Sequence, residues 1–139
     1  THNVPGIAGL AAGIDFVRAQ RTERILLHER QLLRRAGEGM GRIPHVSCCL
    51  ARDEKRQAGV LSFTVSGMQP EQVAEQMASR GVALRAGLHC APFAHRTAGT
   101  LPDGTVRMSV SAFNRAFEID AMLFSLREVA AARGRGEIS

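Results

Sequence analysis

The chain has 139 residues, of which 45% are hydrophobic and 22% are charged, and its formal net charge is +5. This length and composition predict one globular domain with a hydrophobic core, and they exclude an intrinsically disordered chain. No apolar run approaches the ~20 residues that a membrane-spanning helix needs, and the first residues lack the pattern of a signal peptide. Three cysteines without a secretion signal predict a reducing, cytoplasmic setting.

The positive charge comes almost entirely from arginine, because Lys55 is the only lysine. The arginines are scattered along the chain, and there is no tryptophan or tyrosine to stack on nucleic-acid bases. We therefore interpret most arginines as parts of solvent-exposed faces or subunit contacts. Nucleic-acid binding is the weakest of the alternatives that the charge leaves open.

Two helices are predicted at residues 5–17 and 22–37, because apolar residues recur there at three- and four-residue spacing. Thr22 is a candidate N-cap of the second helix, and Gly37 and Pro44 are expected to mark its end. The expected inward-facing residues are Ile7, Leu10, Ala11, Ile14 and Val17 in the first helix, and Ile25, Leu26, Leu32 and Leu33 in the second.

The rest of the chain is predicted to form strands and two further helices. Cys48 and Cys49 lie in the first strand and should face opposite ways, because side chains alternate along a strand. The predicted fold class is α+β, with a short mixed or antiparallel sheet packed under helices. Residues 1–133 are expected to form this domain and residues 134–139 a disordered tail. The predicted strands are residues 45–50, 59–66, 82–85 and 105–110, and the helices are residues 70–80 and a closing helix capped by Asn114, with Phe117, Ile119, Ala121, Met122, Leu126 and Val129 inward.

The segment at residues 86–104 is predicted to be a loop, and its length for a compact domain indicates a function. It contains Cys90, which is the best candidate nucleophile in the chain. His89 is adjacent, with Arg85 and His95 close in sequence, and neighbouring cations lower the pKa of a thiol from about 8.5. The alternative is a structural cysteine, because free cysteines are among the most buried residues. The chemistry of these residues leaves both interpretations open.

Five stretches together resemble the C-terminal part of cysteine desulfurases and selenocysteine lyases, which are enzymes of the class V aminotransferase superfamily that use pyridoxal phosphate. The resemblance also includes the opening residues 1–10 and the strand at residues 60–63, so it covers nearly the whole chain. It implies the small C-terminal domain of a fold-type I pyridoxal-phosphate enzyme. The five stretches are residues 85–92 (RAGLHCAP), 99–100 (GT), 104–107 (GTVR), 113–114 (FN) and 118–120 (EID).

The resemblance implies a reaction in which pyridoxal phosphate forms a Schiff base with L-cysteine or selenocysteine. The thiolate of Cys90 then attacks the substrate sulfur, which leaves alanine and a persulfide for an acceptor protein. Arg107 matches the arginine that binds the substrate carboxylate, for which a planar guanidinium is suited. His89 and Arg85 are assigned a supporting role for the loop and the thiolate. Thr1 matches the threonine that reaches the cofactor phosphate of the partner subunit, which implies a homodimer.

The chain departs from the family pattern at Ala86, where the family usually has Ser or Thr, and at Arg115, where it usually has Thr. Neither change removes a chemical group that the reaction needs. The family's cofactor-binding domain has no counterpart here, and Lys55 does not match its Schiff-base lysine in motif or context. The 139 residues alone are therefore expected to be inactive, as one part of a longer enzyme.

The sequence leaves three other interpretations open. The chain could belong to a class V aminotransferase with another amino-acid substrate, or it could be a non-catalytic sulfur-relay or interaction domain of the same fold. A metal-binding module would use His89, Cys90 and His95 with Cys48 or Cys49. Their spacing matches no standard zinc pattern, so no metal is expected.

Overall fold

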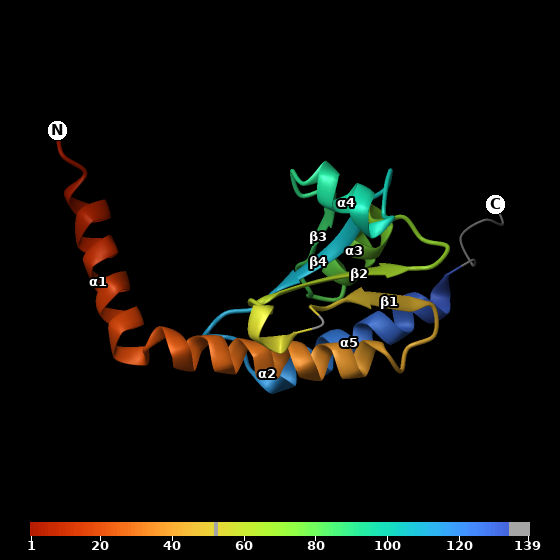
Figure 1. Cartoon of the computed structure of the whole chain (residues 1–139), viewed down its shortest axis with the longest axis horizontal. Helices are drawn as coiled ribbons and strands as arrows, with labels where there is room; N and C mark the ends of the chain where they lie inside the picture. The colour runs from red at the N-terminus through yellow and green to blue at the C-terminus, as the bar shows by residue number, and fades with distance from the viewer. Residues whose placement is uncertain (52, 134–139) are drawn as a thin grey trace.

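The computed structural model describes residues 1–51 and 53–133, and in this part of the chain helices lie on both sides of one four-stranded sheet (Figure 1). The predicted tail at residues 134–139 lies outside the described residues. The elements in chain order are α1 (Val4–Gln20), α2 (Thr22–Met40), β1 (Val46–Cys49), the 3-10 turn η1 (Glu54–Arg56), β2 (Val60–Val65), α3 (Pro70–Ala78), β3 (Arg85–Gly87), α4 (Pro92–Ala98), β4 (Thr105–Ser109) and α5 (Ala116–Ala132).

The sheet has the strand order β1-β2-β4-β3, and all three pairings are antiparallel. The predicted α+β class is therefore confirmed, and of the mixed and antiparallel alternatives the antiparallel one is correct. In the register of β2 with β4, Phe63 lies opposite Val106, and the next pair along is Ser62 opposite Arg107. Because directly paired residues point to the same side, the sheet has one apolar face and one polar face.

The apolar face carries the hydrophobic core. Helices α2 and α5 lie against it, as Figure 1 shows, and α3 contacts β3, β4 and α5 from the same layer. The core extends from the sheet to the inner sides of these helices, and its fully buried large side chains are Leu33, Met40, Leu61, Phe63, Val73, Met77, Val106, Leu126 and Val129.

Helix α2 runs to Met40, three residues beyond the predicted end, because its glycines pack against neighbours instead of ending it. A Cβ on Gly39 would collide with the side chain of Leu123 in α5, and one on Gly37 would meet the side chain of Leu50. The predicted cap Thr22 is also wrong, because Arg21 occupies the N-cap position and has a positive φ of 68°.

Helix α5 begins with a capping box instead of the predicted Asn114 cap. The N-cap is Arg115, whose backbone N–H donates to Glu118 Oε2 at 2.7 Å, while Asn114 Oδ1 accepts from the N–H of Ser111 at 2.9 Å. The predicted inward positions Phe117 and Ala121 are exposed, whereas the other four members of that stripe are buried.

Helix α1 is present as predicted, and Asn3 caps it by accepting from the N–H of Gly6 at 3.0 Å. None of its residues is buried, and it extends away from the sheet in Figure 1. Its apolar stripe is therefore not part of the core, since Leu10 is 66% exposed. An apolar stripe left open in this way is typical of a surface that another protein segment covers. Within the described residues, no helix is long and apolar enough to cross a membrane.

The predicted strand at residues 82–85 is shifted, because only Arg85–Gly87 pair with β4 and form β3. The following segment was predicted as a loop throughout, but it contains the two-turn helix α4. Pro92 stands in the first turn of α4, and Gly99 ends it with a left-handed φ of 69°. This short helix was missed because seven residues are too few to show a helical repeat of apolar positions.

Candidate functional site

The polar face of the sheet carries one row of side chains that crosses all four strands. Cys49 of β1 pairs with Ser62 of β2, Ser62 pairs with Arg107 of β4, and Arg107 pairs with Arg85 of β3. Helix α4 lies on the opposite side of the sheet from α2 and α5 (Figure 1). The polar row therefore lies on the side of the sheet where α4 and the Cys90 loop are found.

A cavity of about 370 Å³ lies between the polar row and α4. It collects residues from β1, β2, β4, the Cys90 loop and α4, which are distant in sequence. The lining residues are Cys49, Ser62, His89, Ala91, Ala94, His95, Ala98, Thr100, Thr105 and Arg107.

Three buried side-chain polar atoms in the described part of the chain have no hydrogen-bonding partner, and all three belong to residues that line this cavity. They are His89 Nδ1, Thr105 Oγ1 and Arg107 Nε. Buried polar atoms are nearly always hydrogen-bonded in folded proteins, and each exception needs an explanation. The arrangement offers two donors and one ring nitrogen to a small polar ligand, and the cationic guanidinium favours a carboxylate.

His89 joins the Cys90 loop to β4. Its Nε2 lies 3.2 Å from the backbone oxygen of Thr105, and because a carbonyl can only accept, Nε2 carries the hydrogen. In the neutral ring Nδ1 is then an unprotonated acceptor that lines the cavity. Burial lowers the pKa of His89 below its ordinary value of 6.5, and the nearby charge of Arg107 acts in the same direction, while the Thr105 bond opposes them. The ring is therefore neutral near pH 7 and can take a proton at Nδ1.

This burial predicts how stability depends on pH. When pH falls below about 6.5, the unfolded chain protonates His89 more readily than the folded chain does, so the free energy of unfolding should fall. His89→Gln removes this contribution, and its stability should decline less steeply than that of the parent protein. The measurement is urea unfolding at several values between about pH 7.5 and pH 5. His2→Gln, at the exposed start of the chain, is the control, and equal slopes for the parent and His89→Gln would contradict the prediction.

His95 holds α4 over the cavity. The residue is only 8% exposed, its Nδ1 lies 2.7 Å from Thr100 Oγ1, and its ring centroid lies 6.0 Å from that of His89. From the sequence, His95 is expected only as a cation near Cys90 or as a ligand of the alternative metal module, and Thr105 has no expected role in the site. The alternation along the predicted strand could have found Thr105, because it shares a face with Arg107.

Cys90 lies at the edge of this cavity. Its two chain neighbours His89 and Ala91 line the cavity, and Cys90 itself is an exposed free thiol. In this chain Cys90 is therefore not a buried cysteine, and its chemical role stays a prediction. Both His89 and Cys90 have positive φ angles, 51° and 60°, which is uncommon for residues other than glycine and is enriched at functional sites.

The other predicted site residues are distributed unevenly. Arg85 is exposed and belongs to the polar row beside Arg107, but it does not line the cavity. Thr1 precedes α1, whose start lies far from α4 in Figure 1, so the structure does not bring it to the cavity within one chain. The role assigned to Thr1 stays a prediction.

Lys55 is exposed on η1, and its backbone oxygen accepts from Arg30 Nη2 at 2.5 Å. It does not line the cavity that contains Arg107. The described residues therefore do not fit covalent attachment of pyridoxal phosphate beside the proposed substrate site, because the only lysine of the chain lies elsewhere.

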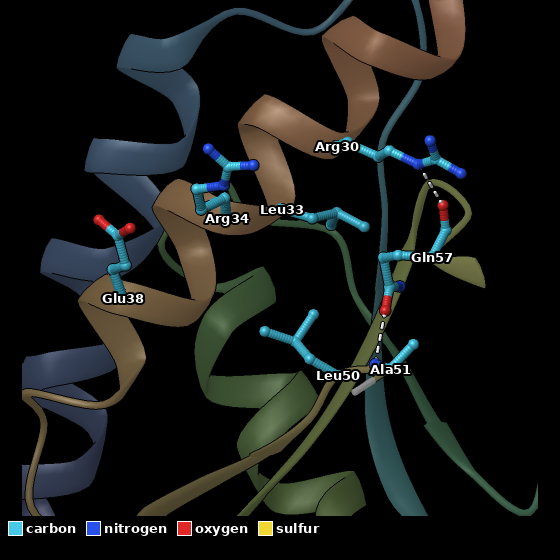
Figure 2. A pocket seen from close by; sticks show the side chains of 7 residues that line it. All are labelled: Arg30, Leu33, Arg34, Glu38, Leu50, Ala51 and Gln57. Carbon is cyan, nitrogen blue, oxygen red and sulfur yellow. Dashed lines mark hydrogen bonds between the residues drawn. The ribbon is translucent and has the colours of Figure 1, made fainter. Parts of the chain in front are cut away.

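A second cavity, of about 250 Å³, lies between α2 and the turn that follows β1 (Figure 2). Its walls include Leu33 and Leu50, and Figure 2 shows Arg30 turned toward Gln57 across it. Arg30 Nε donates to the backbone oxygen of Gln57 at 2.9 Å, and Gln57 Oε1 accepts from the N–H of Ala51 at 2.8 Å. These polar groups hold the turn against α2, and none of the predicted site residues is among the lining.

Comparison with known proteins places this chain in a family. Residues 1–122 match the family model described as "Aminotransferase class-V". The chain therefore belongs to the class-V aminotransferase family, as the resemblance of its motifs predicted.

The relatives within this family are named as cysteine desulfurases. The chain is 36% identical over 130 residues to a probable cysteine desulfurase of Mycolicibacterium paratuberculosis, which covers 94% of this chain and 18% of that protein. It is 33% identical over 130 residues to a probable cysteine desulfurase of Pyrococcus abyssi, covering 93% of this chain and 31% of that protein.

Solved structures agree with this assignment. The apo structure of the cysteine desulfurase from Thermococcus onnurineus NA1 matches with a TM-score of 0.87 and 33% identity, covering 95% of this chain and 32% of that chain. The Escherichia coli cysteine desulfurase CsdA, in an S-sulfonic acid form, matches with a TM-score of 0.81 and 25% identity, covering 94% of this chain and 31% of that chain. The chain thus spans about a third or less of the length of these relatives.

Proposed function

We propose that this chain is the small C-terminal part of a pyridoxal-phosphate-dependent cysteine desulfurase, which removes sulfur from L-cysteine. In this proposal Arg107 binds the substrate carboxylate and Cys90 takes the sulfur. The observation that carries the proposal is the cavity in which Arg107 Nε is buried without a partner, directly beside the loop that exposes the Cys90 thiol.

The roles of the chain's own residues follow from their positions. The guanidinium of Arg107 offers a cationic donor in a half-buried setting, which favours a carboxylate over a neutral group. Neutral His89, with its free Nδ1, can accept a proton within the cavity. The sulfur–carbon bond of the substrate breaks as the Cys90 thiolate bonds to the sulfur, so that alanine leaves and Cys90 carries a persulfide. Because Cys90 is exposed, its persulfide can meet an acceptor protein.

The cofactor in this proposal is supplied by other parts of the enzyme. Bound pyridoxal phosphate acts as an electron sink for the amino-acid substrate. Its lysine lies outside these 139 residues, and Thr1 reaches the cofactor phosphate of a partner subunit, so we propose a cytoplasmic homodimer. The open apolar stripe of α1 agrees with a neighbouring segment that covers it.

The experiment uses the longest polypeptide that the source encodes, incubated with pyridoxal phosphate and L-cysteine. After digestion without reductant, we expect the peptide that contains Cys90 to be heavier by one sulfur atom. Cys90→Ser should remove this product, because a hydroxyl cannot form the persulfide. Arg107→Lys should raise KM for L-cysteine about tenfold or more, since lysine keeps the charge but loses the two-pronged geometry.

The second candidate function is that of a class V aminotransferase with another amino-acid substrate, in which Cys90 has no chemical role. The match to the class-V aminotransferase model fits this candidate as well, although the relatives and solved structures cited above are named as cysteine desulfurases. An unmodified Cys90 peptide from a protein that carries pyridoxal phosphate, together with full activity of Cys90→Ser on another amino acid, would support this candidate and contradict the desulfurase proposal.

A further inference from the structure

Cys49 has no role in the proposed function, yet it shares the cavity with Arg107. It is the last residue of β1, and it is an exposed free thiol. Its partner in the neighbouring strand is Ser62, which in turn pairs with Arg107. Because strands lie ~4.8 Å apart, the backbones at Cys49 and Arg107 are separated by about 10 Å across β2. A ligand of a few heavy atoms can therefore lie between the thiol and the guanidinium.

A second observation shows that this space offers a ligand a buried polar group to bond. Thr105 is only 2% exposed and lines the cavity, and its hydroxyl has no hydrogen-bonding partner among the described residues. A buried hydroxyl without a partner destabilises the folded chain unless something in the cavity bonds to it. Together with the free Nε of Arg107, it defines one end of a binding site whose opposite wall is the Cys49 thiol.

We propose that Cys49 is a second reactive thiol of this cavity and a modification site for small electrophiles that carry a carboxylate. The class of natural electrophile that fits is the disulfide of a small thiol that carries a carboxylate, and this carboxylate would bind Arg107. This inference rests on the carboxylate-binding role of Arg107 in the proposed function, but it requires neither the cofactor nor Cys90.

The chemistry is a thiol–disulfide exchange. Cys49 loses its proton to solvent, and its thiolate attacks one sulfur of the small disulfide. The new bond joins Cys49 Sγ to that sulfur, while the original sulfur–sulfur bond breaks and the other half leaves as a thiolate. The small disulfide is itself the oxidant, because one of its halves is reduced as Cys49 is oxidised. With iodoacetate the same thiolate displaces iodide and forms a carboxymethyl thioether.

The adjacent Cys48 is an internal control in the same chain. It lies opposite Phe63, so it faces the apolar side of the sheet, where it packs against the core. Burial raises the pKa of the Cys48 thiol, with a smaller contribution from Cys49. Cys48 should therefore react slowly with charged and neutral reagents alike, although it differs from Cys49 by one position.

The test compares iodoacetate, which carries a carboxylate, with iodoacetamide, which is neutral and of similar size. The rate of modification at each cysteine of the 139-residue chain is read by fragment-ion mass spectrometry, which separates Cys48 from Cys49. The same chain unfolded in urea gives the reference ratio of the two rates. We expect the folded chain to favour iodoacetate at Cys49 about fivefold more than this reference, as for a charge-assisted contact in a half-open site.

Two matched variants decide the cause of that preference. Arg107→Gln should return the ratio at Cys49 to the unfolded reference, whereas Arg96→Gln should leave it unchanged. Arg96 has the same charge and lies on α4, but it stacks on Phe93 and does not line the cavity. If Arg107→Gln does not fold, the test is protection of Cys49 by a competing carboxylate. Millimolar L-alanine should then slow the carboxymethylation of Cys49 in the parent chain.

The inference is overturned if Cys49 shows the unfolded ratio in the folded chain, if Arg107→Gln keeps the preference, or if L-alanine gives no protection where that variant is unfolded. These results would leave the persulfide experiment on Cys90 unaffected, and that experiment tests the proposed function separately. If Cys49 is modified as expected but no persulfide forms on Cys90, the site at Cys49 is supported and the desulfurase proposal is contradicted.

Discussion

Replacement of Phe63 by alanine is expected to lower the free energy of unfolding by about 3–5 kcal/mol. Phe63 is fully buried at the centre of the sheet, where it pairs with Cys48 on one side and with Val106 on the other. The substitution removes a ring from a close-packed core and leaves a cavity that its neighbours fill only in part. A loss of this size is a large fraction of the ~5–15 kcal/mol that stabilises a typical domain.

Urea unfolding followed by circular dichroism measures this loss. Phe124→Ala is the matched control, because it deletes the same ring from α5 at a position that is 61% exposed. We expect the control to change the free energy of unfolding by less than about 0.5 kcal/mol. Similar losses for the two variants would mean that Phe63 is not the centre of the core.

Gly104→Ala is expected to destabilise the chain by about 2–4 kcal/mol, and it also acts on the proposed site. Gly104 directly precedes β4 and has a φ of +86°, a left-handed conformation that an L-residue adopts only with strain. A Cβ at this position would also collide with the backbone carbonyl of Gly87. Because Gly87 pairs with Thr105, the collision falls on the join between β3 and β4.

Two readouts test this second prediction. Urea unfolding should report the lost stability, and the preference of Cys49 for iodoacetate should fall, because β4 carries both Thr105 and Arg107. Gly99→Ala separates backbone strain from collision, since Gly99 also has a positive φ of 69° but no atom lies within 4 Å of its added Cβ. The control should cost only about 1 kcal/mol. Equal losses in the two variants would show that the collision has no effect.

Local patterns in the sequence predicted most of the fold. Helical spacing identified α1 and α2, and alternation in β4 correctly separated the apolar residues from Arg107 and Ser109. The errors lie where local signals are weak or have two meanings. Glycine in α2 predicts a helix end although it accommodates a neighbouring side chain, and α4 is too short to show a repeat.

The candidate site was predictable only in part. From residue order alone, the motif around Cys90 and the strand that contains Arg107 were recognisable as two parts of the candidate site. The contribution of Cys49 was not predictable, because it depends on which strands are neighbours and in what register. Alternation shows that Cys48 and Cys49 face opposite ways, but not which of them shares a face with Arg107.

The sequence by itself thus determined the α+β order of elements apart from α4, the family and the loop thiol, since these follow from local spacing and from motifs. The tertiary structure decided the membership of the cavity, the buried atoms without partners and the exposure of the α1 stripe. The physical reason is that strand register and packing join residues far apart in the chain, such as Cys49 and Arg107. No pattern within either strand predicts that these two residues lie close together, because their proximity depends on how the strands pair in the folded sheet.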